Sequence, residues 1–245
     1  MKKRLGWLAI LCILTTSSLT AQYSMGVTGL LNIPTADMQA DGTFMAGGNF
    51  LPEAITPDTW DYNTGNYFVN LTFFPFVELA YRCTMFRGEF KAGNKWQQDR
   101  SVSVRIRPLK EKEGKWWPSL VVGSNDALTT RQLNMFKDSG GNRYFSSVYA
   151  VATKHWGVGG HDLGFTFGGH VPFRKGSESK GVFGGVAYSP AFCRELQLMT
   201  EYDSDGVNVG AAARLFRHVS IHLFCYDFSA ISAGIRYEVK LLKKK

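Results

Sequence analysis

Apolar and polar residues alternate along most of this chain, in short blocks that turn residues separate. In the block from Val207 to Leu215, valines, alanines and a leucine occupy every second position. The residues between them are Asn208, Gly210, Ala212 and Arg214. A period of two is the pattern of a β-strand. Beyond the N-terminal leader no segment has a convincing helical period, so we expect an all-β fold.

Twelve such blocks follow one another. We expect strands at residues 43–51, 66–74, 76–89, 100–107, 118–125, 145–154, 162–169, 181–189, 195–203, 207–215, 219–226 and 231–239. Each strand with its connection takes roughly 19 residues, which matches a membrane strand of about 9–11 residues and a turn. The even number and this spacing favour an antiparallel up-and-down transmembrane β-barrel over residues 43–239.

The two ends of the chain have other patterns. Lys2, Lys3 and Arg4 precede an apolar run and then small residues, which is typical of a secretory signal peptide over residues 1–21. Residues 22–42 are too irregular for a strand, and Pro34 interrupts pairing. We expect a periplasmic segment that enters or caps the barrel, with plain coil as an equal alternative. Residues 240–245 form a basic tail that should remain periplasmic.

Composition excludes several classes of protein. Hydrophobic residues make up 44% of the chain, too many for a disordered protein, and four cysteines are too few for a disulfide scaffold. The formal charge is +8, but three of the positive residues lie in the leader. For an exported chain with so mild an excess, nucleic acid is not an expected partner.

Alternation alone fits two architectures. A soluble sandwich or barrel places its apolar face inside, whereas a membrane barrel turns this face to lipid and lines its lumen with polar residues. Charged residues within single strands favour the membrane barrel, because charges of both signs can pair across a lumen. These lumen candidates are Glu78, Arg82, Arg105, Arg107, Glu201, Arg214, Arg236 and Glu238. A solvated outer face is the alternative interpretation.

Aromatic residues at strand ends also favour the membrane barrel, because barrels carry aromatic girdles at both interfaces. The girdle candidates are Tyr67, Phe68, Phe73, Phe74, Trp116, Trp117, Trp156 and Tyr237. The block from Ser232 to Val239 is similar to the terminal strand signal of outer-membrane barrels, although the chain continues beyond it.

The charges in a narrow lumen must be paired, or they destabilise the fold. Glu201 and Arg214 lie on the same face of neighbouring strands but not directly opposite, so a pair needs a stagger or a third partner such as Arg236. The charges either fill the lumen or form a ring that contacts an acidic or neutral glycan.

Four dispersed segments point to a family. They are Gly29–Ala36 with Asp41-Gly42; Phe74-Pro75-Phe76 with Glu78 and Arg82; Ser124-Asn125-Asp126 with Tyr149–Lys154; and Glu201-Tyr202-Asp203 with Gly206, Asn208, Gly210 and Arg214. In this order they resemble the YjbH-type family of outer-membrane proteins of exopolysaccharide biosynthesis. An unusual insertion at residues 130–143 splits the third segment. Some relatives are longer and are lipoproteins, and their additional parts cannot be carried over.

No pattern of catalytic or metal-binding residues is convincing. His218 and His222 would lie about 13 Å apart in a strand, too far for one metal ion. Asp203 and Asp205 begin like a calcium loop, but the remaining ligands are missing. Glu195 and Glu201 would lie about 20 Å apart, beyond the spacing of glycosidase carboxylates. We expect no catalytic residue, no metal and no cofactor, and therefore not an enzyme.

The resemblance implies an outer-membrane barrel that takes part in exopolysaccharide or capsule biosynthesis or export. Two alternatives stay open: a general porin or structural barrel, and a secreted soluble carbohydrate-binding β-protein. The expected partners are outer-membrane lipid, polysaccharide and proteins of the export machinery. Residues 56–65 and 126–143 are the loops that such proteins could contact.

Overall fold

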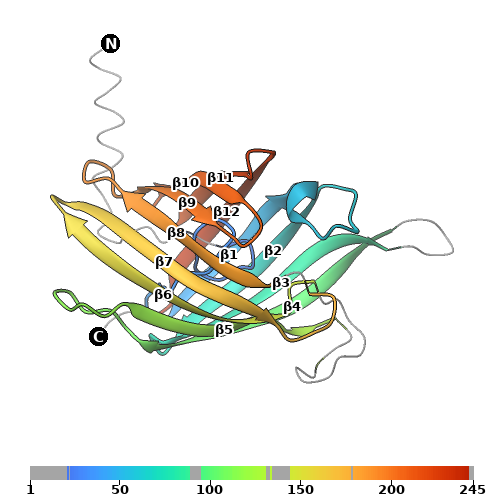
Figure 1. Cartoon of the computed structure of the whole chain (residues 1–245), viewed down its shortest axis with the longest axis horizontal. Coiled ribbons are helices and arrows are strands. Elements are labelled where there is room, and N and C mark those ends of the chain that lie inside the picture. Colours follow the sequence, from blue (N-terminus) through green and yellow to red (C-terminus); the bar gives the residue numbers. More distant parts are fainter. Residues whose placement is uncertain are drawn as a thin grey trace, which may run out of the picture.

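The computed structural model describes residues 21, 23–88, 95–130, 133, 144–177 and 179–242. Twelve antiparallel strands close into one barrel, because β1 pairs with both β2 and β12 (Figure 1). The expected all-β class and twelve-stranded antiparallel barrel are therefore confirmed. Most of the expected signal peptide, most of the 130–143 insertion and half of the basic tail lie outside the described residues.

Each predicted strand overlaps one observed strand. The strands are β1 (Thr43–Leu51), β2 (Thr64–Phe73), β3 (Val77–Gly88), β4 (Lys95–Leu109), β5 (Ser119–Thr129), β6 (Ser147–Val158), β7 (His161–Pro172), β8 (Gly181–Ser189), β9 (Leu196–Tyr202), β10 (Val207–Phe216), β11 (Val219–Tyr226) and β12 (Ala230–Lys240), with a short 3-10 helix η1 (Glu53–Ile55) between β1 and β2. The largest difference is at β4, which begins before residue 100 because Lys95 pairs with Gly88 in a long β3–β4 hairpin.

The two ends of the barrel differ in their connections. Residues 74–76, 159–160 and 217–218 make short turns at the end where β1 begins and β12 ends, which we call the short-turn end. Residues 52–63 and 173–177 lie at the opposite, long-loop end, where β5 also ends and β6 begins. In membrane barrels, short turns are periplasmic and long loops are extracellular. No helix among the described residues is long and apolar enough to cross a membrane.

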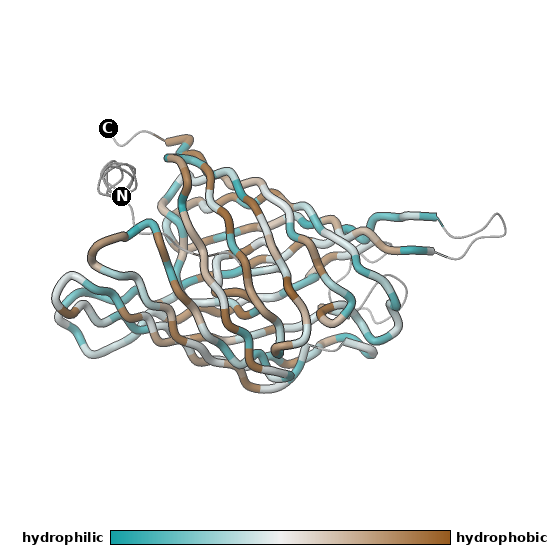
Figure 2. The backbone as a smooth tube through the Cα atoms, turned by 90° about the horizontal axis from the view of Figure 1, so that it is seen from above, coloured by the Kyte–Doolittle hydropathy of each residue, from teal (hydrophilic) through white to brown (hydrophobic). Residues whose placement is uncertain are grey.

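The wall of the barrel has its apolar face outside. Phe167, Leu223 and Ile235 lie on different strands, and each is more than half exposed. Hydrophobic residues recur along strands around the wall (Figure 2). The alternate positions are polar and face inward, so that Arg105, Arg214 and Arg236 are 0%, 8% and 4% exposed. The orientation is the one expected for a membrane barrel and the reverse of a soluble one.

Residues 23–39, which we call the plug segment, lie in the barrel interior ahead of β1. Val27, Leu31 and Ile33 are completely buried. Leu31 and Ile33 belong to one apolar cluster with side chains of the wall, including Tyr149 and Phe183. Gly29 and Pro34 make an antiparallel bridge, so the segment turns back on itself between them.

One predicted girdle residue is wrong. Phe68 is 2% exposed and faces the interior, because its neighbour Tyr67 takes the outward position of the β2 alternation. The Phe68 ring packs against the plug segment at Gly26, where an added Cβ would lie 2.9 Å from the Phe68 Cβ. Gly26 also has φ +84°, which favours glycine.

Candidate functional site: the plug segment and the lumen charges

Glu78 and Arg105 face each other across the β3–β4 pair. The Arg105 Nε lies 3.0 Å from the Glu78 Oε2, and both side chains are fully buried. Burying a charge is costly unless it is paired and hydrogen-bonded. The pairing of the two strands brings the opposite charges together, and the plug segment supplies most of the remaining partners.

Both members of this pair bind the plug backbone. The Thr28 N–H donates to the Glu78 Oε1 at 2.7 Å, and the Asn70 amide donates to the same oxygen at 2.7 Å. The Arg105 guanidinium donates to the carbonyl oxygens of Thr28 and Thr35 at 2.7 and 2.9 Å, and also to that of Asp37. Glu78 and Arg105, which we call the first anchor, therefore hold both sides of the turned plug.

The tip of the plug is held from the opposite side. The Glu201 carboxylate accepts the N–H groups of Leu31 and Asn32 at 2.9 and 2.6 Å. The Asn208 amide, directly opposite on β10, donates to Glu201 at 3.0 Å. We call Glu201 and Asn208 the second anchor. All three hydrogen bonds come from uncharged donors.

Glu201 and Arg214, whose pairing the sequence left open, engage different partners. Arg214 lies six residues beyond Asn208 on β10, a separation of about 20 Å along a strand. It forms an ion pair with Glu238 of β12, and Arg236 lies 3.5 Å from the other oxygen of the same carboxylate. The C-terminal charges thus meet near the short-turn end, whereas Glu201 lies near the long-loop end.

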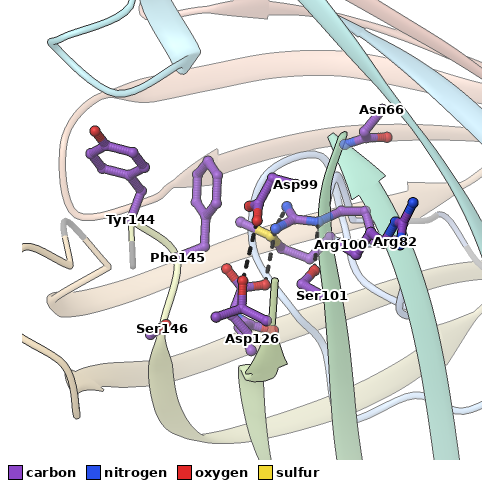
Figure 3. A network of polar contacts seen from close by, with 12 residues as sticks. Asn66, Arg82, Asp99, Arg100, Ser101, Asp126, Tyr144, Phe145 and Ser146 are labelled. Atoms are coloured by element: carbon purple, nitrogen blue, oxygen red, sulfur yellow. Dashed lines mark hydrogen bonds and ion pairs between the residues drawn. The ribbon is translucent and has the colours of Figure 1, made fainter. Parts of the chain in front are cut away.

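Arg82 belongs to a third group of contacts, shown in Figure 3. Its guanidinium lies 3.0 Å from the Asp126 carboxylate, donates to Ser101 at 3.3 Å and contacts the sulfur of Met25 in the plug. It also lies over the Phe145 ring at 4.7 Å. All of these contacts are near the long-loop end.

Asp126 was missed by the sequence analysis, which ended the strand at residue 125. The β4–β5 register shifts between Val102 and Val104, and Asp126 has φ 48°. This irregularity turns the carboxylate inward and breaks the alternation. The Ser124-Asn125-Asp126 segment of the family resemblance was the available signal.

Arg107, the last of the eight candidates, is partly exposed at the rim of the short-turn end. It donates to the Pro75 carbonyl at 2.7 Å. Nearby, His155 lies 3.1 Å from an oxygen of Asp37 and 2.9 Å from one of Asp162. The sequence gives no signal for this contact, because the plug residue Asp37 is distant in sequence from His155 and Asp162.

The contact with His155 changes the acidity of Asp37. Partial burial alone would raise the pKa of the Asp37 carboxyl. The hydrogen bond from His155, the charge of His155 and that of Arg105 act in the opposite direction and lower this pKa below its ordinary value. Asp37 is therefore a carboxylate at neutral pH and adds a third contact where the plug leaves the lumen.

The part of the chain that the structure describes holds no group of three or more histidine, cysteine or acidic residues placed to bind a metal. What the arrangement provides is a buried set of charges that fixes a backbone segment inside a barrel. Four of the eight candidates from the sequence, Glu78, Arg82, Arg105 and Glu201, contact that segment directly.

The comparisons with known proteins agree with this description. The family model YjbH, described as "Exopolysaccharide biosynthesis protein YbjH", matches residues 21–241. The "Uncharacterized lipoprotein YjbH" of Escherichia coli (strain K12) is 27% identical over a 154-residue alignment that covers 60% of this chain. The match spans 19% of that relative's length. The family match runs through the plug segment and all twelve strands, and the chain belongs to the YjbH family of exopolysaccharide biosynthesis proteins.

Proposed function

We propose that this protein is an outer-membrane β-barrel that takes part in the export step of exopolysaccharide production without catalysing a reaction. The observation that carries the proposal is the outward apolar face of a barrel whose interior is charged. Phe167, Val171, Leu223 and Ile231 are each more than half exposed. A soluble monomer rarely exposes a contiguous apolar surface of more than a few hundred Å². Lipid would cover this surface.

Aromatic side chains at the short-turn end support the same location. Phe74 and Tyr237 are 63% and 47% exposed. Such rings favour the boundary between headgroups and hydrocarbon. Together with the short turns and the positions of the β1 start and β12 end, they favour an orientation with the short-turn end in the periplasm.

The plug segment inside the lumen bears on the kind of role that the barrel can have. The plug residues Val27, Leu31 and Ile33 are inaccessible to solvent, and buried charges hold the backbone around them. A general porin needs an aqueous bore, so the plug favours a specialised barrel over that alternative. We place the polysaccharide contact at a mouth of the barrel, with the plug closing the lumen.

Fractionation of producing cells tests the location. The protein should sediment with the outer membrane, should need detergent for extraction and should migrate differently on gels before and after heating. Deleting its gene should lower the amount of exopolysaccharide outside the cell, and the wild-type gene should restore it. Recovery in the soluble periplasmic fraction would contradict the membrane proposal, and an unchanged polymer yield would favour a general structural barrel.

The absence of catalysis is tested separately. Purified protein incubated with the polymer of its own host should leave the polymer's length and its reducing ends unchanged. A rise in reducing ends over a buffer control would contradict the non-catalytic role.

A further inference from the structure

The short-turn end carries a cavity that the plug anchors do not use. Its volume is about 1680 Å³, above the roughly 300–1,000 Å³ of sites for small ligands. It is lined by the exit of the plug at residues 37–41, by the β4–β5 connection around residues 110–116, and by ends of β6 and β12. A space of this size suits a portion of a polymer.

The acidic groups of this cavity are largely engaged within the protein. Glu111 forms an ion pair with Lys154 and accepts the His155 N–H at 3.1 Å. Asp37 and Asp162 share the His155 ring. Two further acids, Asp41 and Glu113, line the cavity without an ion pair among the described residues.

More cations than acids are left without a charged partner. Arg107, Lys110, Lys115 and Lys240 all line the cavity, and none forms an ion pair with any residue that the structure describes. The Arg107 side chain reaches only a carbonyl, and the Lys115 ammonium lies 5.7 Å from the Trp117 ring centre. Asp37 and Asp162 share the single charge of the His155 ring, so three negative charges stand against these four positive ones, and the cavity keeps a small positive excess that is available to an anion.

Aromatic surface lies beside these cations. Trp116 is 86% exposed and makes no ring contact with the described residues. Trp156 is half exposed, packed edge-on against Phe165 at 5.1 Å. An indole offers a large, rigid apolar face. The apolar face of a sugar ring can pack on it while lysines bind the acidic substituents.

We infer that this cavity binds a segment of an anionic polysaccharide, a glycan whose sugars carry carboxylate groups. This inference rests on the proposed function and names the ligand class of its periplasmic mouth. Lys110 and Lys240 would form charge-assisted hydrogen bonds with carboxylates, and Trp116 would stack on a sugar ring. Asp37 connects the cavity to the plug, because its backbone is held by Arg105 and its side chain lines the cavity.

The test uses the full chain in nanodiscs of uncharged lipid, with oligogalacturonate as the probe and dextran fragments as the uncharged comparison. Wild-type protein should bind oligogalacturonate more tightly than dextran, and the affinity should fall about tenfold between about 0.05 and 0.5 M salt. The double variant Lys110→Gln/Lys240→Gln and the variant Trp116→Ala should each lose about three- to tenfold in affinity.

Two matched controls come from the same end of the barrel. Lys112→Gln removes the same charge from the same connection, but Lys112 does not line the cavity. Phe192→Ala removes a ring that is 79% exposed, also outside the cavity. Both should bind oligogalacturonate within about twofold of wild type.

Three results would overturn the inference. The first is that wild-type protein does not bind oligogalacturonate, and the second is that Lys112→Gln loses as much affinity as the cavity variants. The third is that the cavity variants change only the interaction with anionic phosphatidylglycerol, which would identify a lipid-headgroup site. Fractionation and polymer yield are measured on the strains that produce the wild-type protein and the same variants. An outer-membrane protein that is required for polymer yet does not bind oligogalacturonate disproves this inference and leaves the proposed function standing. A protein that is found in the soluble fraction yet binds oligogalacturonate disproves the proposed membrane location and leaves the ligand class of the cavity standing.

Discussion

The two anchors hold the plug with the same group, a buried carboxylate that accepts backbone N–H groups, but they balance its charge differently. At the first anchor, Arg105 supplies an opposite charge at 3.0 Å from Glu78 and donates to three plug carbonyls. At the second anchor, Glu201 is bound by the Leu31 and Asn32 N–H groups and by the Asn208 amide.

The first anchor therefore depends on an ion pair, whereas the second depends on hydrogen bonds from uncharged groups. In the first anchor each partner depends on the other, so that the loss of one leaves an uncompensated buried charge. In the second anchor the carboxylate can be neutralised and still accept hydrogen bonds. The base of the turned plug should therefore be held more strongly than its tip.

Arg105→Met should have the largest effect. It leaves the Glu78 carboxylate without its cation and three plug carbonyls without their donor. Removing one partner of a buried pair costs about 3–5 kcal/mol. The free energy of unfolding, measured by urea titration of protein refolded in lipid vesicles, should fall by about this amount.

Arg107→Met is the control, because Arg107 lies on the same face of β4 but is partly exposed and bound to a single carbonyl. It should cost no more than about 1 kcal/mol. Adding Glu78→Gln to Arg105→Met should recover part of the loss, as expected for coupled residues. Equal costs for the two arginine variants would show that the first anchor does not hold the plug by charge.

Glu201→Gln should have an intermediate effect. The amide retains one acceptor oxygen, but its NH₂ group faces a backbone N–H. The expected loss is about 1–3 kcal/mol, below that of Arg105→Met. The same urea titration measures it, with the exposed Glu53→Gln as the reference variant. A loss larger than that of Arg105→Met would reverse the ranking of the two anchors.

Acid should have the smallest effect, through Asp37 at the plug exit. Because its pKa is lowered in the folded protein, the contribution of Asp37 is present above the unfolded pKa, about 3.9, and is lost as the pH falls through the lower folded value. Asp37→Asn should show a shallower loss of stability below about pH 4 than wild type. The neighbouring variant Asp41→Asn should follow wild type, and identical acid profiles for all three proteins would refute a role for Asp37.

The strands were predictable because a polar inward face and an apolar outward face impose a strict period of two. The β9 and β10 sequences show this period clearly. The inward direction of Glu78, Arg105, Glu201 and Arg236 followed from the same period. It failed where the period is broken, as at Asp126, where a register shift adds an inward carboxylate.

The partners of the lumen charges were not predictable in the same way. Strand alternation fixes the face of a residue but says nothing of an irregular segment such as Thr28–Asp37. The contacts of Glu78, Arg105 and Glu201 are with backbone groups of that segment, and any residue type offers such groups. Residue identity therefore carries little signal for them, apart from glycine at Gly26, where the Phe68 ring leaves no room for a side chain.

The most direct test of a lumen closed by its anchored plug is conductance in planar bilayers of the refolded protein. Wild type should show no steady conductance, and Arg105→Met should show openings that Arg107→Met lacks. A steady ohmic conductance of wild type, unaltered by Arg105→Met, would contradict the account.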